Sequence, residues 1–238
     1  ITYFLAFALF HFLGRKNGWS NKLIGCLILT AGLSNSSFLG YPIIEALFGK
    51  KGLETAVLVD QPGTFVVVST LGVFTAAFYS KGSPNALGIL KKIILFPPFV
   101  MFVISCLMNI FQYDLNENIQ LLLLKIGSLV TPLALLSVGL QLTFDQKSQH
   151  WKFLRLGLFF KLILVPFVIF VLYVFIFNQR SEVIKITLMQ TAMAPMITGA
   201  ILASTYGLKP KLSSMMIGFG IPISFVTLAV WYFVLSFI

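Results

Sequence analysis

The sequence predicts an all-α polytopic membrane protein, and both its composition and its patterning indicate this class. Of 238 residues, 58% are apolar, only 10% are charged and 25 are phenylalanine. Soluble domains are typically about 45–50% apolar and about 25% charged. The apolar residues also gather in runs near 20 residues long, the length at which a helix crosses about 30 Å of hydrocarbon. These observations exclude a water-soluble globular fold.

Eight apolar runs follow one another along the chain, separated by short connections. They cover residues 1–13, 23–48, 53–79, 93–111, 119–142, 154–177, 183–206 and 212–238. The first run is too short to cross a bilayer, so we expect further sequence before Ile1. No connection has the composition of a soluble domain or a flexible linker, which indicates one membrane unit.

Basic residues lie between the runs rather than along one face, so the net charge of +10 does not indicate nucleic-acid binding. Lysine and arginine accumulate in cytoplasmic loops. They are concentrated in alternate connections, at Arg15, Lys16, Lys22, Lys81, Lys91, Lys92, Lys147, Lys152, Arg155, Lys209 and Lys211. We therefore expect an integral protein of the plasma (inner) membrane, with these loops in the cytoplasm and both visible ends outside.

The run 23–48 contains an unusual cluster of helix-breaking and small polar residues. The cluster comprises Gly32, Ser34, Asn35, Ser36, Ser37, Gly40 and Pro42. Unpaired backbone groups are costly in lipid, so a broken helix persists only where protein or a water-filled cavity satisfies them. This cluster predicts an unwound crossing near the midplane, where helix N-termini and polar side chains bind an anionic group. The alternative is a proline kink with small residues for close helix packing.

The run 183–206 carries a plainer set of the same kind, which makes the crossing interpretation stronger. Its members are Gln190, Thr191, Pro195, Thr198 and Gly199. The run that follows each cluster also has a similar motif, Pro-Gly-Thr-Phe at 62–65 and Pro-Ile-Ser-Phe at 222–225. Because the two broken runs enter from opposite sides by loop charge, the repeat is inverted. The symmetry then predicts ten helices in the intact protein, eight of them present here.

Asp60 and Glu45 are candidates for ion or proton coupling, because carboxylates inside a membrane usually mark ion pathways or buried pairs. Asp60 reaching the interface is the alternative. Lys161 lies near the cytoplasmic end of its run, and we expect it to extend to the headgroups. Cys26 and Cys106 are expected to be packing residues, with no metal and no disulfide. Motifs of hydrolases, metalloproteases and phosphate-binding loops are missing from the sequence, which argues against an enzyme.

The segment Gly-Leu-Ser-Asn-Ser-Ser-Phe-Leu-Gly-Tyr-Pro-Ile-Ile-Glu-Ala-Leu-Phe-Gly at 32–49 resembles the fourth helix of the auxin efflux carrier family of permeases. Residues 131–142, 190–206 and 221–235 are similar to its seventh, ninth and tenth helices. The resemblance implies a ten-helix inverted-repeat fold similar to that of bile acid symporters. Residues 1–80 and 151–238 would form a mobile transport part, and residues 81–150 would form half of a scaffold part.

The same resemblance implies roles for five residues. The first crossing segment contains Asn35 and Pro42, and the second contains Gln190 and Pro195. In the helix after the first crossing segment, Gln61 matches a glutamine that faces the substrate. Members of the family carry organic acid anions, auxin in plants and malate or malonate in bacteria. This chain lacks the large cytoplasmic loop of plant members, since only residues 81–92 stand there. The comparison therefore favours bacterial-type dicarboxylates over auxin.

We expect a secondary transporter of small organic anions that works by alternating access, with malate- or malonate-like dicarboxylates or auxin-like monocarboxylates as substrates. Its expected substrate-binding residues are Asn35, Ser36, Ser37, Gly40, Pro42, Gln61, Gln190, Thr191, Pro195 and Thr198. No cofactor is expected beyond coupling sodium or protons, and a homodimer would form through the scaffold part. The alternatives are a non-transporting membrane sensor or partner subunit derived from such a carrier, and a channel.

Overall fold

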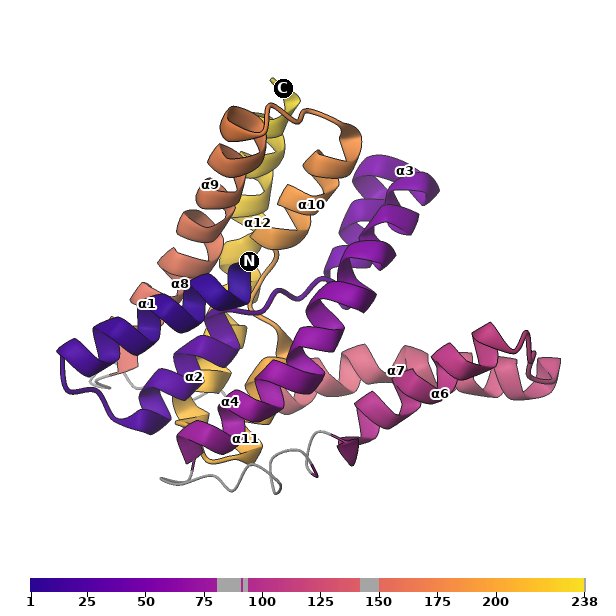
Figure 1. Cartoon of the computed structure of the whole chain (residues 1–238), viewed down its shortest axis with the longest axis horizontal. Coiled ribbons are helices and arrows are strands. Elements are labelled where there is room, and N and C mark those ends of the chain that lie inside the picture. The colour runs from indigo at the N-terminus through magenta and orange to yellow at the C-terminus, as the bar shows by residue number, and fades with distance from the viewer. Residues whose placement is uncertain (81–90, 92–93, 142–149, 238) are drawn as a thin grey trace.

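The computed structural model describes residues 1–80, 91, 94–141 and 150–237, which are largely helical (Figure 1). Its α-helices are α1 (Thr2–Lys16), α2 (Asn21–Ala31), α3 (Gly40–Val59), α4 (Val73–Ser80), α6 (Pro97–Ile110), α7 (Glu117–Gln141), α8 (His150–Phe159), α9 (Val165–Phe170), α10 (Glu182–Ala192), α11 (Ile197–Thr205) and α12 (Pro210–Ser236). Wider π-helical segments join some of them, namely η1 (Asp60–Phe65), η2 (Val68–Gly72), η3 (Phe160–Leu164) and η4 (Val171–Ile176).

Local sequence explains several helix boundaries. The Ser20 hydroxyl accepts a hydrogen bond from the Leu23 N–H at 3.3 Å and so caps the start of α2. Prolines begin α6 and α12, where the missing N–H costs no helical hydrogen bond. Gly49 has φ of 69°, a left-handed conformation that favours glycine, and it bends α3 into two helical parts. The part before Gly49 completes the apolar run 23–48, and the part after it begins the run 53–79.

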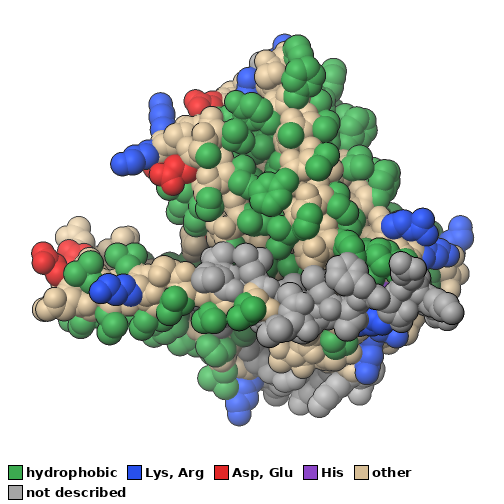
Figure 2. Space-filling view, turned by 180° about the vertical axis from the view of Figure 1, so that it is seen from behind, with side chains coloured by type: hydrophobic (Ala, Val, Ile, Leu, Met, Phe, Trp, Pro, Cys, Tyr) green, Lys and Arg blue, Asp and Glu red, His purple; other side chains and the backbone are tan. Residues whose placement is uncertain are grey.

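Three helical stretches within the described ranges are long and apolar enough to cross a membrane, and the first of them includes the bend at Gly49. They cover Gly40–Ser80, His150–Ile176 and Pro210–Ser236. Large apolar side chains such as Leu58, Phe167 and Phe233 are exposed on them. On the face seen in Figure 2, the middle of the main bundle is hydrophobic and the charged side chains gather toward its ends. The predicted all-helical membrane fold is confirmed.

Helix α2 lies at the centre of the bundle, in contact with α1, α4, α8, α11 and α12. All residues from Leu23 to Ala31 are buried. Glycines permit the close approach of its neighbours: a Cβ atom on Gly199 of α11 would lie 2.6 Å from the Leu29 carbonyl oxygen. The helix that leads into the first predicted break is therefore held on several sides.

Helices α6 and α7 form a hairpin that projects from this bundle (Figure 1), and α7 contacts α12. They are the described helices of the predicted scaffold part, 81–150. The loop lysines at 81, 92 and 147 lie outside the described residues. The division into transport and scaffold parts stays a prediction.

Candidate substrate site at the crossing of two broken helices

Two helices are interrupted where the sequence predicts breaks, and the interruptions meet. Helix α2 ends at Ala31 and α3 begins at Gly40, while α10 ends at Ala192 and α11 begins at Ile197. The Asn35 N–H donates to the Ala194 carbonyl at 2.8 Å, and the Met196 N–H donates to the Leu33 carbonyl at 3.2 Å. These bonds satisfy backbone groups that the breaks release from the helices.

Ser34 and Pro195 form an isolated antiparallel β-bridge at this crossing point. The two segments therefore run in opposite directions where they meet, as an inverted repeat requires. Pro195 is buried, and a Cβ atom on Gly220 of α12 would lie 2.7 Å from its Cδ atom. Close packing against α12 thus fixes the second crossing segment.

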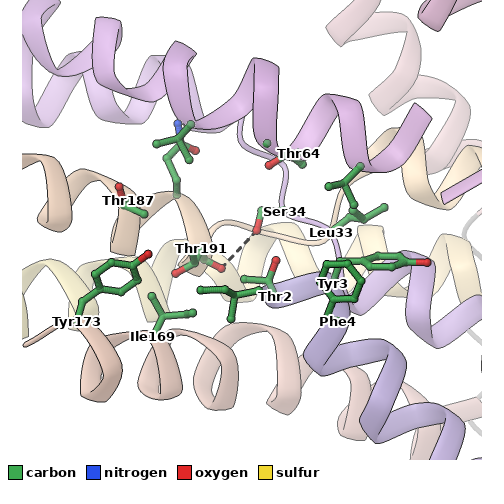
Figure 3. A pocket seen from close by; sticks show the side chains of 15 residues that line it. Thr2, Tyr3, Phe4, Leu33, Ser34, Thr64, Ile169, Tyr173, Thr187 and Thr191 are labelled. Carbon is green, nitrogen blue, oxygen red and sulfur yellow. Dashed lines mark hydrogen bonds between the residues drawn. The ribbon is translucent and has the colours of Figure 1, made fainter. Parts of the chain in front are cut away.

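A cavity of about 320 Å³ lies beside the crossing point (Figure 3). Ser34 and Thr191 line it from the two broken helices, and Figure 3 shows their hydrogen bond, from the Ser34 hydroxyl to the Thr191 carbonyl at 3.5 Å. The other lining residues are Ile1, Thr2, Tyr3, Phe4, Leu33, Val59, Gly63, Thr64, Val67, Ile169, Tyr173, Thr187 and Gln190. The lining combines hydroxyl and amide groups with aromatic and aliphatic surface.

Two buried amide side chains at the crossing have amide atoms without a hydrogen-bond partner within the described ranges. Both amide atoms of Gln190 and the Nδ2 atom of Asn35 are unpaired, although each residue is only 1% exposed. Buried polar groups in proteins are nearly always hydrogen-bonded, so an unpaired one is a candidate to bind a water or ligand molecule. Gly40 makes space for Gln190, since a Cβ atom there would lie 2.4 Å from Gln190 Oε1.

A second polar cluster lies on the α3 side of the first crossing segment. The carboxylate of Asp60, which is 2% exposed, accepts hydrogen bonds from the Ser36 hydroxyl at 2.5 Å and the Tyr41 hydroxyl at 2.7 Å. The Gln61 Nε2 group lies 3.4 Å from both Asp60 Oδ2 and the Tyr41 oxygen. Asp60 is therefore buried against the crossing segment and hydrogen-bonded within the protein.

The expectation that Lys161 extends to the headgroups is wrong. Lys161 belongs to η3, and its side chain is fully buried. Its Nζ atom donates to Ser34 Oγ at 2.5 Å and to the Thr191 carbonyl at 2.8 Å. Sequence position indicates depth along a helix but not which face a side chain occupies. The one available signal was the general rule that an intramembrane charge usually faces the protein interior.

The remaining predicted site residues are placed less centrally. Pro42 and Glu45 are exposed on α3, with Pro42 in the first turn after the crossing segment rather than within it. Ser37 and Thr198 are half-buried. Within the described ranges, no three histidine, cysteine or acidic side chains lie close enough to hold a metal ion.

A helical membrane protein in which two broken, antiparallel helices meet beside a cavity has the architecture of a transporter. The model of a family described as membrane transport protein matches residues 85–232. An uncharacterized transporter of Methanocaldococcus jannaschii is 30% identical over 225 residues, covering 90% of this chain and 70% of that protein. An uncharacterized transporter of Methanothermobacter thermautotrophicus is 28% identical over 222 residues, covering 93% and 71%. The chain belongs to this membrane transport protein family, the auxin efflux carrier family.

Proposed function

We propose that this protein is a secondary transporter that moves small organic acid anions across the membrane by alternating access. The observation that carries the proposal is the pairing of two broken helices at Ser34 and Pro195, beside a cavity lined by the unpaired Gln190 amide. A substrate that accepts a hydrogen bond from Gln190 Nε2 would satisfy a donor that is otherwise left without a partner in the described structure.

A buried positive charge beside the cavity supports an anionic group on that substrate. The Lys161 ammonium contacts Ser34 and Thr191, which both line the cavity. Helices α3 and α11 also begin at the crossing, where helix N-termini carry partial positive charge, although their first residues are not among those that line the cavity. The hydroxyl groups of Thr2 and Thr64 line the cavity and can donate further hydrogen bonds. This arrangement favours a carboxylate.

The rest of the lining bears on the substrate body. Tyr3, Phe4 and Tyr173 are aromatic, and Leu33, Val59, Val67 and Ile169 are aliphatic. Apolar lining binds apolar ligand surface, with a few polar groups setting orientation. This lining suits an auxin-like monocarboxylate with an apolar body, in contrast to the dicarboxylates that the short cytoplasmic loop favours, because a second carboxylate would face uncharged side chains.

The proposal includes the motion and the orientation. Residues 1–80 and 151–238 would move as the transport part against a scaffold that includes α6 and α7, and a second copy would pack on that scaffold. The basic loops would face the cytoplasm of a cell bounded by the plasma membrane. If an ion is coupled to transport, the buried Asp60 is the better site for it than the exposed Glu45.

Uptake by the full-length protein in proteoliposomes tests the proposal. We expect saturable uptake of a labelled organic acid from a panel of mono- and dicarboxylates, with monocarboxylates preferred. Gln190→Ala and Asn35→Ala should reduce uptake about tenfold, the effect of about 1.4 kcal/mol of lost binding. Gln120→Ala, at an exposed position on α7, is the matched control and should leave uptake unchanged.

Two results would contradict the proposal. One is a flat binding and uptake response to every organic acid in the panel. The other is wild-type uptake by both crossing variants, which would remove the crossing from the transport path. A current that grows in proportion to substrate without saturation would indicate a channel instead.

A further inference from the structure

A fully buried lysine at the crossing point is the feature that the proposed transport cycle leaves unexplained. Lys161 lies within the membrane-crossing stretch His150–Ile176, and its side chain is 0% exposed. Removing an ammonium group from water costs several kcal/mol unless its surroundings compensate. The groups that contact Nζ therefore define what this lysine does.

Those groups belong to the two broken helices. Nζ donates to Ser34 Oγ in the first crossing segment at 2.5 Å and to the Thr191 carbonyl in α10 at 2.8 Å. Both partners are formally neutral. The buried carboxylate of Asp60 forms no ion pair with Lys161 and instead accepts hydrogen bonds from Ser36 and Tyr41.

The position of Thr191 explains how a neutral carbonyl compensates a full charge. Thr191 is the second-last residue of α10, which ends at Ala192 where the chain unwinds. The last carbonyl groups of a helix lack partners within it, and the helix C-terminus carries partial negative charge. In transporters with broken helices, such carbonyl ends coordinate coupling cations. Here a side-chain ammonium occupies a carbonyl end of this kind.

We propose that Lys161 is the resident cation of the crossing point. Its ammonium group neutralises the carbonyl end of α10 and ties it to Ser34 of the first crossing segment, so the crossing needs no bound metal cation. Lys161 is a positioning residue, because it holds Ser34 and Thr191, which both line the cavity. The inference rests on the proposed function only where uptake is measured.

Thermal unfolding of the purified full-length protein tests this role without a substrate. Lys161→Met keeps most of the side-chain volume and removes the charge. Lys161→Ala removes both and leaves space for a small amine. The control is Lys152→Ala, which alters an exposed lysine on the same membrane-crossing stretch.

We expect the wild type to have the same Tm in sodium chloride and choline chloride of equal ionic strength. Lys161→Met should lower the Tm by about 5 °C or more, whichever salt is present. Lys161→Ala should recover part of its loss in ethylammonium chloride and none in tetramethylammonium chloride, which is too large for the space. Lys152→Ala should match the wild type in every salt.

Two results would overturn the inference. One is a sodium effect on the wild type, either a Tm that rises by several degrees or an uptake that rises severalfold. The other is a Lys161→Met protein with the Tm and uptake of the wild type. If neither variant folds, the wild-type comparison of sodium with choline still decides. The expected Tm pattern without uptake of any organic acid would contradict the proposed function and leave the role of Lys161 supported. Uptake of an organic acid by a wild-type protein that depends on sodium would support the proposed function and contradict the role of Lys161.

Discussion

Gly40 and Gln190 come from different broken helices and fit against each other at the crossing point. A Cβ atom on Gly40 would lie 2.4 Å from Oε1 of Gln190, closer than real side-chain contacts allow. Because Gln190 is the flexible partner, a side chain at residue 40 would displace the amide and leave the backbone in place. The lack of a side chain at Gly40 therefore sets where the Gln190 amide lies in the cavity wall.

Gly40→Ala should consequently impair substrate binding more than folding. We expect the KM for uptake to rise about tenfold, the consequence of a misplaced hydrogen bond worth about 1.4 kcal/mol. The Tm should stay within a few degrees of the wild type. Uptake kinetics in proteoliposomes measure the first effect, and an unchanged KM would show that the Gln190 amide is not a substrate contact.

Gln190→Leu should stabilise the protein while weakening transport. An unpaired buried polar group costs about 1–3 kcal/mol, and an apolar side chain of similar size removes that cost. We expect a Tm above the wild-type value together with the same loss of uptake, about tenfold, as in Gln190→Ala. A lower Tm would mean that the amide has a structural partner.

Asp60→Asn and Glu45→Gln distinguish the two candidate coupling residues. Asp60 accepts hydrogen bonds from Ser36 and Tyr41, and an amide in its place turns one acceptor into a donor. Hydrogen bonds to a charged group are worth about 1.5–3 kcal/mol each, so uptake and Tm should both fall. Glu45→Gln, at an exposed position, should behave as the wild type. Equal losses in both variants would contradict this assignment.

Gly199→Ala should destabilise the bundle around α2. The new Cβ atom would lie 2.6 Å from the Leu29 carbonyl oxygen, and backbone cannot move aside as a side chain can. Overpacking of this kind costs about 1–3 kcal/mol. Gly127→Ala is the control, since a Cβ atom there meets nothing within 4 Å. Thermal unfolding of the two variants side by side measures the difference.

Cysteine labelling tests the orientation proposed from loop charge. In a background with Cys26→Ala and Cys106→Ala, Asn17→Cys and Asp114→Cys place single thiols at exposed positions in two different connections. A membrane-impermeant maleimide added to intact cells should label Asp114→Cys and not Asn17→Cys. The reverse pattern would invert the topology.

The two helix breaks and their meeting could be predicted because their cause is local. Glycine, serine, asparagine and proline within a few residues cannot sustain a helix, and a broken helix in lipid requires a partner. Hydropathy also predicted the apolar runs 53–79, 154–177 and 212–238, which lie within or largely overlap the three stretches that can cross a membrane, although the first of those stretches also contains part of the run 23–48. Proline typically marks a break, which predicts Pro42 within the crossing, but Pro42 lies in the first turn of α3, where its missing N–H is tolerated.

The roles of Asp60 and Lys161 could not be predicted in the same way. The surroundings of each charge depend on how its helix is rotated about its own axis. Sequence periodicity does not determine this rotation in runs that are apolar on every side. For Asp60 the sequence allows either burial or a position at the interface. For Lys161 it predicts a position at the headgroups, whereas the side chain is buried.

Both buried charges stand in π-helical segments, Asp60 at the start of η1 and Lys161 within η3. A π-helical turn holds about one residue more than an α-helical turn, which offsets everything beyond it by about 100°. Deleting one residue from either segment would restore α-helical register and swing the flanking sequence around the helix axis. The helical register of these spans is therefore constrained as well as the identity of their charged residues. Single-residue deletions within η1 or η3 should be tolerated far less well than conservative substitutions.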